Sequence, residues 1–146
     1  MIGAGRMGRP IVDRLVAAGY EPTVLTRRPT ARAAGEAAGL RCADTLRETV
    51  RDAQVVLTVV FDDEQLRAAA LGPAGLIAAM PADGILVQHT TCDSATMTLL
   101  AETAASRGIR VLDAALSGQP ARRRRRPAHR MGGRRGASAG GGASAA

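Results

Sequence analysis

Three glycines near the start of the chain have the spacing of a phosphate-binding turn. Gly3, Gly5 and Gly8 spell G-x-G-x-x-G and lead directly into an amphipathic segment. In such a turn the first glycine permits a tight change of direction, the second lets the backbone approach a pyrophosphate, and the third lets a helix pack closely on a sheet. The first N–H groups of that helix have no intrahelical partner and lie at the positive end of its dipole, where a diphosphate is stabilised. The spacing therefore predicts a dinucleotide-binding turn, provided that a helix and then a strand follow it.

A second group of candidate residues ends the strand expected at residues 23–26. In dinucleotide folds, a side chain about 20 residues after the glycine motif contacts the adenosine ribose. Here the strand ends in Thr26, Arg27 and Arg28, with no carboxylate among them. A carboxylate would accept a hydrogen bond from the ribose 2′-OH of NAD, whereas a guanidinium binds a 2′-phosphate through two parallel hydrogen bonds. The sequence favours NADP over NAD, and the alternative is that Arg27 and Arg28 are only a solvated strand end.

Helices and strands are expected to alternate along the chain. Apolar residues recur at three- and four-residue spacing over residues 7–18, which is typical of a helix, and Gly19 ends that helix. Residues 55–60 are a continuous apolar run rich in β-branched side chains, as in a parallel strand covered on both faces. Further helices are expected at residues 30–38, 45–52, 64–71, 76–80 and 93–107, and further strands at residues 40–43, 85–87 and 108–112. Thr45 and Glu48 have the spacing of a capping box, Asp62 or Asp63 is expected to cap the helix that follows it, and Asp93 is expected to cap the last helix. The alternation predicts an α/β fold with a doubly wound parallel sheet of the Rossmann type.

This sheet is expected to be incomplete at both ends. Only Met1 and Ile2 precede the glycine motif, so the first strand is expected to be a stub. From residue 122 onward the pattern stops, and a segment made almost entirely of Arg, Ala, Gly and Pro cannot form a core. The expected domains are a partial NAD(P)-binding domain, residues 1–121, and a disordered basic tail, residues 122–146. GC-rich codons specify these four residue types, so translation out of frame is the first hypothesis for the tail and a nucleic-acid arm the second.

Composition narrows the functions that the chain can have. All 13 acidic residues precede residue 122, so the net charge of +7 comes from the tail, and every one of the 20 basic residues is Arg. Tyr20 and Phe61 are the only aromatic residues, which leaves no stacking surface for single-stranded nucleic acid. Cys42 and Cys92 have neither metal-ligand spacing nor a disulfide framework, which suits a reducing cytosol. The sequence shows no signal peptide and no membrane-spanning run, so we expect a cytoplasmic protein with no membrane or metal site, and nucleic acid is not the expected partner.

Several segments, taken in order, resemble the cofactor domain of the β-hydroxyacid dehydrogenases, the family that includes 3-hydroxyisobutyrate dehydrogenase and the 6-phosphogluconate dehydrogenases. The segments are the glycine motif with its methionine, Arg27 after the second strand, residues 55–63 followed by G-x-x-G-L at residues 72–76, and residues 88–94 and 113–119. The resemblance covers residues 1–120. Three positions depart from the family pattern, where Gln88 replaces an Asp, Ser94 a Pro and Gln119 a Gly.

The resemblance implies which residues contact the ligands. The cofactor-binding residues would be Gly3, Gly5, Arg6, Met7, Gly8, Thr26, Arg27, Arg28, Val60, Phe61 and Thr91. The substrate-binding residues would be Thr90, Ser117 and Gly118. The implied reaction is hydride transfer between NADP and a small 3-hydroxy acid or its semialdehyde, by an enzyme whose full-length relatives are homo-oligomers.

The family's general acid/base is a lysine, and this chain contains none. Nothing after residue 120 resembles the family's helical domain, so we assign no catalytic residue and expect an NADP-binding domain that is inactive as a fragment. The alternatives are a non-catalytic NADP-binding module and, third, a basic-tailed nucleic-acid-binding protein. His89 and Cys92 are interpreted as structural side chains because no partner that would activate them is fixed by the sequence. Asp113 is expected to satisfy loop amides.

Overall fold

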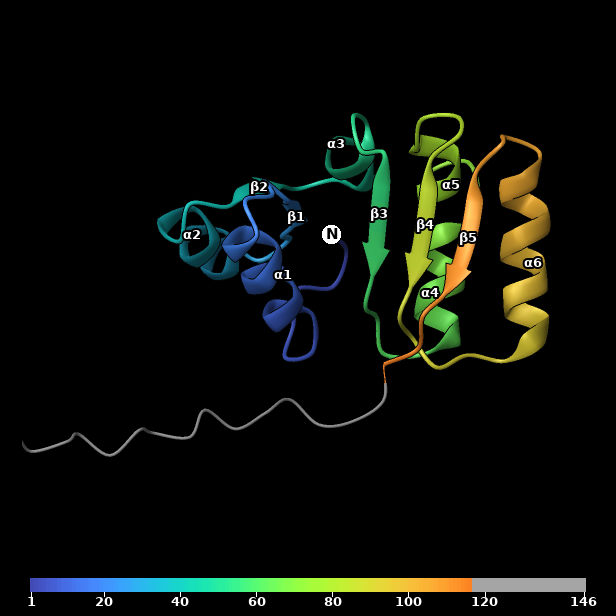
Figure 1. The fold of residues 1–146 in the computed structure, drawn as a ribbon, viewed down its shortest axis with the longest axis horizontal. Helices are drawn as coiled ribbons and strands as arrows, with labels where there is room; N and C mark the ends of the chain where they lie inside the picture. The colour runs from blue at the N-terminus through green and yellow to red at the C-terminus, as the bar shows by residue number, and fades with distance from the viewer. Residues whose placement is uncertain (117–146) are drawn as a thin grey trace, which may run out of the picture.

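In the computed structural model, residues 1–116 are described, and they form alternating strands and helices (Figure 1). The strands are β1 (Thr23–Leu25), β2 (Arg41–Ala43), β3 (Val55–Thr58), β4 (Ile85–Gln88) and β5 (Arg110–Asp113). The helices are α1 (Gly8–Ala17), α2 (Pro29–Ala37), α3 (Leu46–Val50), α4 (Asp63–Ala70), α5 (Leu76–Ala79) and α6 (Ser94–Ala105). Every pairing between these strands is parallel, so the α/β fold expected from the sequence is confirmed.

The expected strand stub joins two separate groups of strands. β1 pairs with β2, and β3, β4 and β5 pair in that order. Ile2 forms a single parallel bridge with Thr58 of β3, and Met1 accepts a hydrogen bond from Leu25 of β1. The spatial order is therefore β2, β1, the Met1–Ile2 bridge, β3, β4 and β5, with the bridge at the centre where the sequence leaves only two residues.

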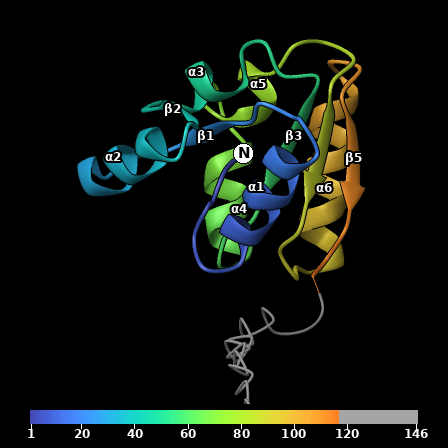
Figure 2. The same ribbon diagram turned by 60° about the vertical axis from the view of Figure 1, so that its left-hand side comes forward.

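The two faces of the sheet are covered by different helices. Consecutive strand residues point to opposite faces. Val56 and Leu86 pack with residues of α4, α5 and α6 in one buried cluster, while Leu57 packs with Met1 and Val12 of α1 in another. In Figures 1 and 2, α1 accordingly lies on the side of the sheet opposite to α4 and α5. Both faces of the central strands are covered, which explains the uninterrupted apolar run of β3.

Side-chain caps fix where several helices begin. The hydroxyl of Thr45 accepts a hydrogen bond from the N–H of Glu48 at 3.1 Å, which is one of the two hydrogen bonds of the expected capping box. Asp62 caps α4 by accepting from the N–H of Gln65 at 2.9 Å, which decides between the two aspartates that the sequence offered. Asp93 caps α6 by accepting from the N–H of Thr96 at 2.6 Å, as expected. These caps set the direction in which the chain leaves the carboxyl ends of β2, β3 and β4.

Some expectations fall outside the part of the chain that the structure describes. Ser117, Gly118, the boundary at residue 121 and the basic tail at residues 122–146 all lie beyond residue 116. Among residues 1–116, no helix has the length and apolar character needed to span a bilayer.

Candidate cofactor site

The glycine motif forms the turn between the Met1–Ile2 bridge and α1. Gly3 has a φ of +86°, and a Cβ atom there would lie 1.9 Å from the carbonyl oxygen of Val59. A Cβ atom on Gly8 would lie 2.1 Å from the carbonyl oxygen of Gly3. Both distances are far shorter than a van der Waals contact, so these two positions accept only glycine while the backbone keeps this path. The tight turn predicted for Gly3 and the close packing predicted for Gly8 are present in the structure.

Gly5 differs from the other two glycines because it faces open space. A Cβ atom there would meet nothing within 4 Å, and the residue is exposed, as is Arg6. Met7 is half-buried and precedes the first residue of α1. The first turn of α1 carries no acidic side chain that would compete with an anion. The tip of the turn and the amino end of α1 thus offer backbone donors, positive dipole charge and free room together, which is the arrangement that fits a pyrophosphate.

The carboxyl end of β1 holds an unpaired hydroxyl beside two arginines. Thr26 donates its backbone N–H to the carbonyl of Ala43 at 2.9 Å, but its Oγ1 is buried and has no hydrogen-bond partner among the described residues. Arg27 and Arg28 follow it and are exposed. A buried hydroxyl without a partner is costly, so this atom is suited to a polar ligand group that reaches the strand end.

Arg27 also lines a cavity of about 610 Å³ at this edge of the sheet. The opposite wall is formed by the loop after α4, which includes Gly72 and Gly75 of the G-x-x-G-L segment. Arg47 of α3 lines the same cavity, and sequence reasoning did not select it. The capping box placed Arg47 two residues into a helix, but only the pairing of β1 with β2 brings that helix beside Arg27. Two arginines therefore line the cavity, together with Asp44, whose carboxylate pairs with Arg32.

A threonine hydroxyl after β4 contacts the backbone of the segment after β3. The hydroxyl of Thr90, a buried side chain, accepts from the N–H of Val60 at 3.2 Å and lies 3.1 Å from the carbonyl oxygen of Val60. Thr90 thus already uses its hydroxyl to hold the two strand ends together. Phe61 is 87% exposed and Thr91 is exposed. Among Val60, Phe61, Thr90 and Thr91, the side chains of Phe61 and Thr91 are exposed and can contact a ligand.

A polar cluster beneath these loops was not foreseen from the sequence. Gln88 is fully buried, and its Nε2 donates to Oδ1 of Asp113 at 2.7 Å and lies 3.4 Å from Sγ of Cys92. Its Oε1 accepts from the N–H of Thr90 at 2.8 Å. Among residues 1–116, Asp113 therefore binds a side-chain amide of the neighbouring strand, whereas we expected it to bind loop amides. The register that places Gln88 opposite Asp113 creates this pair.

Neither His89 nor Cys92 has the surroundings of a reactive group. The ring nitrogen Nδ1 of His89 lies 2.8 Å from the carbonyl oxygen of Ala114, so this nitrogen must carry the hydrogen. Burial raises the pKa of the Cys92 thiol, and nearby aspartates, first Asp63 and then Asp113, raise it further. A raised pKa keeps the thiol protonated and inert. The structural interpretation of both side chains is therefore supported by their contacts.

Comparisons with known proteins agree with this geometry. The sequence profile of the family described as the NAD binding domain of 6-phosphogluconate dehydrogenase matches residues 1–140. An uncharacterized oxidoreductase, YfjR, of Bacillus subtilis is 32% identical over 120 residues, which are 82% of this chain and 42% of that protein. The chain thus spans about two fifths of the length of this relative.

Two solved structures are similar in fold. A Mycobacterium tuberculosis 3-hydroxyisobutyrate dehydrogenase, solved with L-serine, superposes with a TM-score of 0.72 and 28% identity, covering 81% of this chain and 40% of that one. An imine reductase from Myxococcus stipitatus in complex with NADP+ gives a TM-score of 0.66 and 28% identity, covering 77% and 38%. In both proteins the similar fold is part of a longer chain. The profile match spans nearly the whole sequence, and the chain therefore belongs to the family of the NAD binding domain of 6-phosphogluconate dehydrogenase.

Proposed function

We propose that this chain binds NADP across the carboxyl ends of its strands, as the cofactor-binding part of a β-hydroxyacid dehydrogenase. The observation that carries the proposal is the open tip of the glycine turn at Gly5, which lies at the amino end of α1 while Arg27 ends the neighbouring strand. The pyrophosphate would lie against the turn, where N–H groups and the helix dipole favour it. Arg6 and Met7 would flank it.

The adenosine end of the cofactor would occupy the cavity beside β1. The 2′-phosphate would be bound by Arg27, with Arg28 and the missed residue Arg47 as further cations, because a guanidinium pairs with a phosphate in two-point fashion. Thr26 would direct its unpaired hydroxyl to the ribose. The absence of any carboxylate from residues 26–28 is the reason to favour NADP over NAD. The complex of the imine reductase with NADP+ adds support from a protein of similar fold.

The nicotinamide end would reach toward the loops after β3 and β4. Phe61 and Thr91 are the exposed side chains there, and Val60 would contribute its backbone. Thr90 would still lie near the substrate, but its hydroxyl already forms a hydrogen bond with Val60. Ser117 and Gly118 would complete the substrate side. The substrate class, a small 3-hydroxy acid or its semialdehyde, is supported by the similarity to a 3-hydroxyisobutyrate dehydrogenase.

Calorimetry with NADPH and NADH tests the cofactor assignment. The chain should bind NADPH more tightly than NADH, and Arg27→Ala should weaken NADPH binding by about 1.5 to 3 kcal/mol with little effect on NADH. Arg51→Ala is the matched control, because Arg51 is an exposed arginine that forms an ion pair with its neighbour Asp52 at 3.3 Å. Equal losses for the two cofactors in Arg27→Ala would remove the 2′-phosphate role.

A non-catalytic NADP-binding module is the second candidate function. It is favoured by the hydrogen bond between Nδ1 of His89 and the carbonyl oxygen of Ala114, which makes that ring nitrogen unavailable as a base. Both candidates bind NADP, so affinity alone does not separate them. They differ in whether a longer polypeptide that contains these residues reduces a semialdehyde with NADPH.

A further inference from the structure

One carboxylate lies among the arginines of the cavity at the carboxyl ends of β1 and β2. Of the described residues that line this cavity, the charged ones are Arg27, Arg47 and Asp44. Asp44 directly follows the last residue of β2, and the register that pairs Leu25 with Ala43 brings it beside the end of β1. Asp44 and Arg27 therefore leave neighbouring strands at the same edge, where the 2′-phosphate of NADP would lie. A negative charge at this place opposes the binding of an anion.

An arginine outside the cavity binds the carboxylate of Asp44. Nη1 of Arg32, in α2, donates to Oδ2 of Asp44 at 2.5 Å. Nε of the same guanidinium donates to Oε1 of Glu36, one helical turn further along α2, at 2.8 Å. Arg32 is not among the described residues that line the cavity. Its positive charge therefore acts on the cavity through Asp44.

The packing of α2 on β2 brings Arg32 within reach of Asp44. Gly35 of α2 is buried, and a Cβ atom there would lie 2.7 Å from Sγ of Cys42 in β2. A larger residue at this position would require the cysteine side chain or the helix to shift. Glu36 holds the guanidinium from the helix side, in the i, i+4 arrangement that is favourable on a helix surface. The helix and the strand end thus fix the guanidinium between two carboxylates.

The pair of Arg32 and Asp44 affects the cavity more than it affects folding. The two side chains are 37% and 64% exposed, and exposed ion pairs contribute little to stability. The hydrogen bond with Asp44, and then that with Glu36, raises the pKa of Arg32, so the guanidinium stays charged. A phosphate monoester carries a charge of about −1.5 to −2 at neutral pH. A charge that is weak in folding can therefore still influence the binding of such an anion nearby.

We propose that Arg32 is a positioning residue that makes this cavity accept a 2′-phosphate, by holding the carboxylate of Asp44 and offsetting its charge. This inference rests on the proposed function, because it requires that NADP binds at the carboxyl ends of the strands. Without Arg32, Asp44 would be an unpaired carboxylate beside the 2′-phosphate of NADP. Such a carboxylate suits the 2′-OH of NAD, which donates a hydrogen bond to it. The preference between the two cofactors thus depends on one ion pair at the rim of the site.

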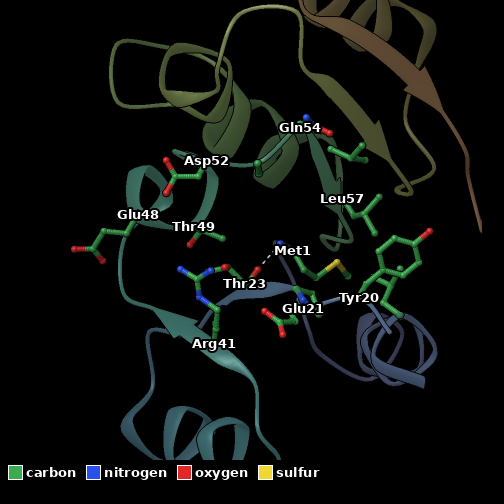
Figure 3. A pocket seen from close by; sticks show the side chains of 14 residues that line it. Met1, Tyr20, Glu21, Thr23, Arg41, Glu48, Thr49, Asp52, Gln54 and Leu57 are labelled. Carbon is green, nitrogen blue, oxygen red and sulfur yellow. Dashed lines mark hydrogen bonds between the residues drawn. The ribbon is translucent and has the colours of Figure 1, made fainter. Parts of the chain in front are cut away.

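Calorimetry on the full chain tests this role. The unaltered chain, Arg32→Ala, Asp44→Asn and the double variant are each titrated with NADPH and with NADH. Arg41→Ala is the control for loss of an arginine, because Arg41 lies at the beginning of β2 and lines a different cavity of about 540 Å³, beside Met1 (Figure 3). Glu36→Gln is the control for loss of a carboxylate, because it removes the partner of Arg32 that does not line the cofactor cavity.

The four chains should differ in their affinity for NADPH. Arg32→Ala should weaken NADPH binding by about 3- to 10-fold, with no loss of NADH binding. Asp44→Asn should tighten NADPH binding by a similar factor. The double variant should bind NADPH as tightly as the unaltered chain, because no carboxylate remains whose charge must be offset. The two controls should change NADPH binding by less than about twofold, since neither alters the charge that lines the cavity.

Rescue by the second substitution separates this role from a direct contact. A double variant that binds NADPH as weakly as Arg32→Ala would overturn the proposal, because Arg32 would then bind the phosphate itself. Equal losses for NADPH and NADH in Arg32→Ala would also contradict it. The loss in Arg32→Ala should nearly disappear in 1 M salt, where the Debye length falls to about 3 Å. A loss of the same size at both salt concentrations would indicate a broken contact and not an altered field.

The same titrations distinguish failure of this inference from failure of the proposed function. If the unaltered chain prefers NADPH and Arg32→Ala keeps that preference in full, the role of Arg32 is wrong and the cofactor assignment stands. If the unaltered chain binds NADPH no more tightly than NADH, the cofactor assignment is wrong and the role of Arg32 is wrong with it. If circular dichroism shows that Arg32→Ala is unfolded, Asp44→Asn decides alone, and an unchanged affinity for NADPH in that variant would overturn the proposal.

Discussion

Gly3 and Val59 approach so closely that a Cβ atom on the glycine would lie 1.9 Å from the carbonyl oxygen of the valine. A Cβ atom on Gly5, two residues later, would meet nothing within 4 Å. Gly3→Ala should therefore lower the free energy of unfolding by more than about 2 kcal/mol, since it combines a clash with a positive φ. Gly5→Ala should change it by less than about 0.5 kcal/mol in urea unfolding.

The same pair of glycines separates folding from binding. Gly5→Val should give a folded protein that binds neither NADPH nor NADH, because the side chain would fill the room left for the pyrophosphate. Circular dichroism reports whether the variant is folded, and calorimetry on the same sample reports whether it binds either cofactor. A Gly5→Val protein that keeps its NADPH affinity would place the pyrophosphate elsewhere.

Arg47 should contribute to NADPH binding although the sequence did not reveal it. It lines the same cavity as Arg27, so Arg47→Ala should weaken NADPH binding by about 1 kcal/mol and leave NADH binding nearly unchanged. The effect is expected to be smaller than for Arg27→Ala, since Arg47 lies on α3 and not at the end of β1. Titrations of the two single variants and the double variant would show whether both arginines contact one phosphate. Strictly additive losses would indicate independent contacts.

The stability of the chain that begins at Met1 should depend on pH between 6 and 8. Burial lowers the pKa of its amine from 8.0 to about 6, so in this window the unfolded chain binds more protons than the folded one. The free energy of unfolding should therefore rise with pH by up to about 2.7 kcal/mol across the window, with the penalty complete below pH 6 and absent above pH 8.

Acetylation of the Met1 amine provides the control for this pH dependence. The acetylated chain keeps every other titrating group, including Glu21, Glu48 and Asp52, which line the same cavity as Met1, so the difference between the two curves belongs to the amine. Urea unfolding at several pH values gives both curves. Parallel curves would mean that the amine is solvated in the folded chain.

The pair formed by Gln88 and Asp113 should stabilise the edge of the sheet. Gln88→Leu removes the donor 2.7 Å from the carboxylate of Asp113 and should lower the free energy of unfolding by about 1.5 to 3 kcal/mol, as for a hydrogen bond to a charged group. Asp113→Asn keeps an acceptor oxygen and should cost less. Urea unfolding ranks the variants, and an unchanged Gln88→Leu would show that the contact contributes nothing net.

These 146 residues alone should have no dehydrogenase activity even if they bind NADPH. No lysine is available to relay a proton, and loss of a general acid/base costs a factor of about 10² to 10⁴ in rate. The assay follows NADPH oxidation with small semialdehydes, beside a longer polypeptide that contains the family's downstream sequence. Turnover at a comparable rate would contradict this expectation, and His89 would be the first residue to replace.

The parts of the fold that local chemistry specifies could be predicted from the sequence. Thr45 and Asp93 were expected as helix caps, and their side chains accept the expected N–H groups. The apolar run of β3 predicted a strand covered on both faces, and its side chains pack in clusters on both sides. Such signals lie within a few residues of one another, so one sequence is enough to read them.

The features that depend on how distant segments pair could not be predicted. Gln88 and Asp113 are 25 residues apart and meet only through the register of β4 and β5. Arg47 reaches the cavity of Arg27 only because β2 lies beside β1. The sequence indicated a short first strand, but not that the amine of Met1 would be buried and would donate a hydrogen bond to the carbonyl oxygen of Thr23. Register and strand order arise from the packing of the whole sheet.

The short Met1–Ile2 bridge affects how cooperatively the molecule unfolds. Among the described residues, the two strand groups are linked through this bridge, so β1 and β2 can separate from β3, β4 and β5 by breaking few ladder bonds. Their amide hydrogens should then exchange with solvent through a partial opening that leaves the larger group protected. A dinucleotide that contacts the end of β1 and the glycine turn at once would bridge the two groups, and would convert two folding units into one.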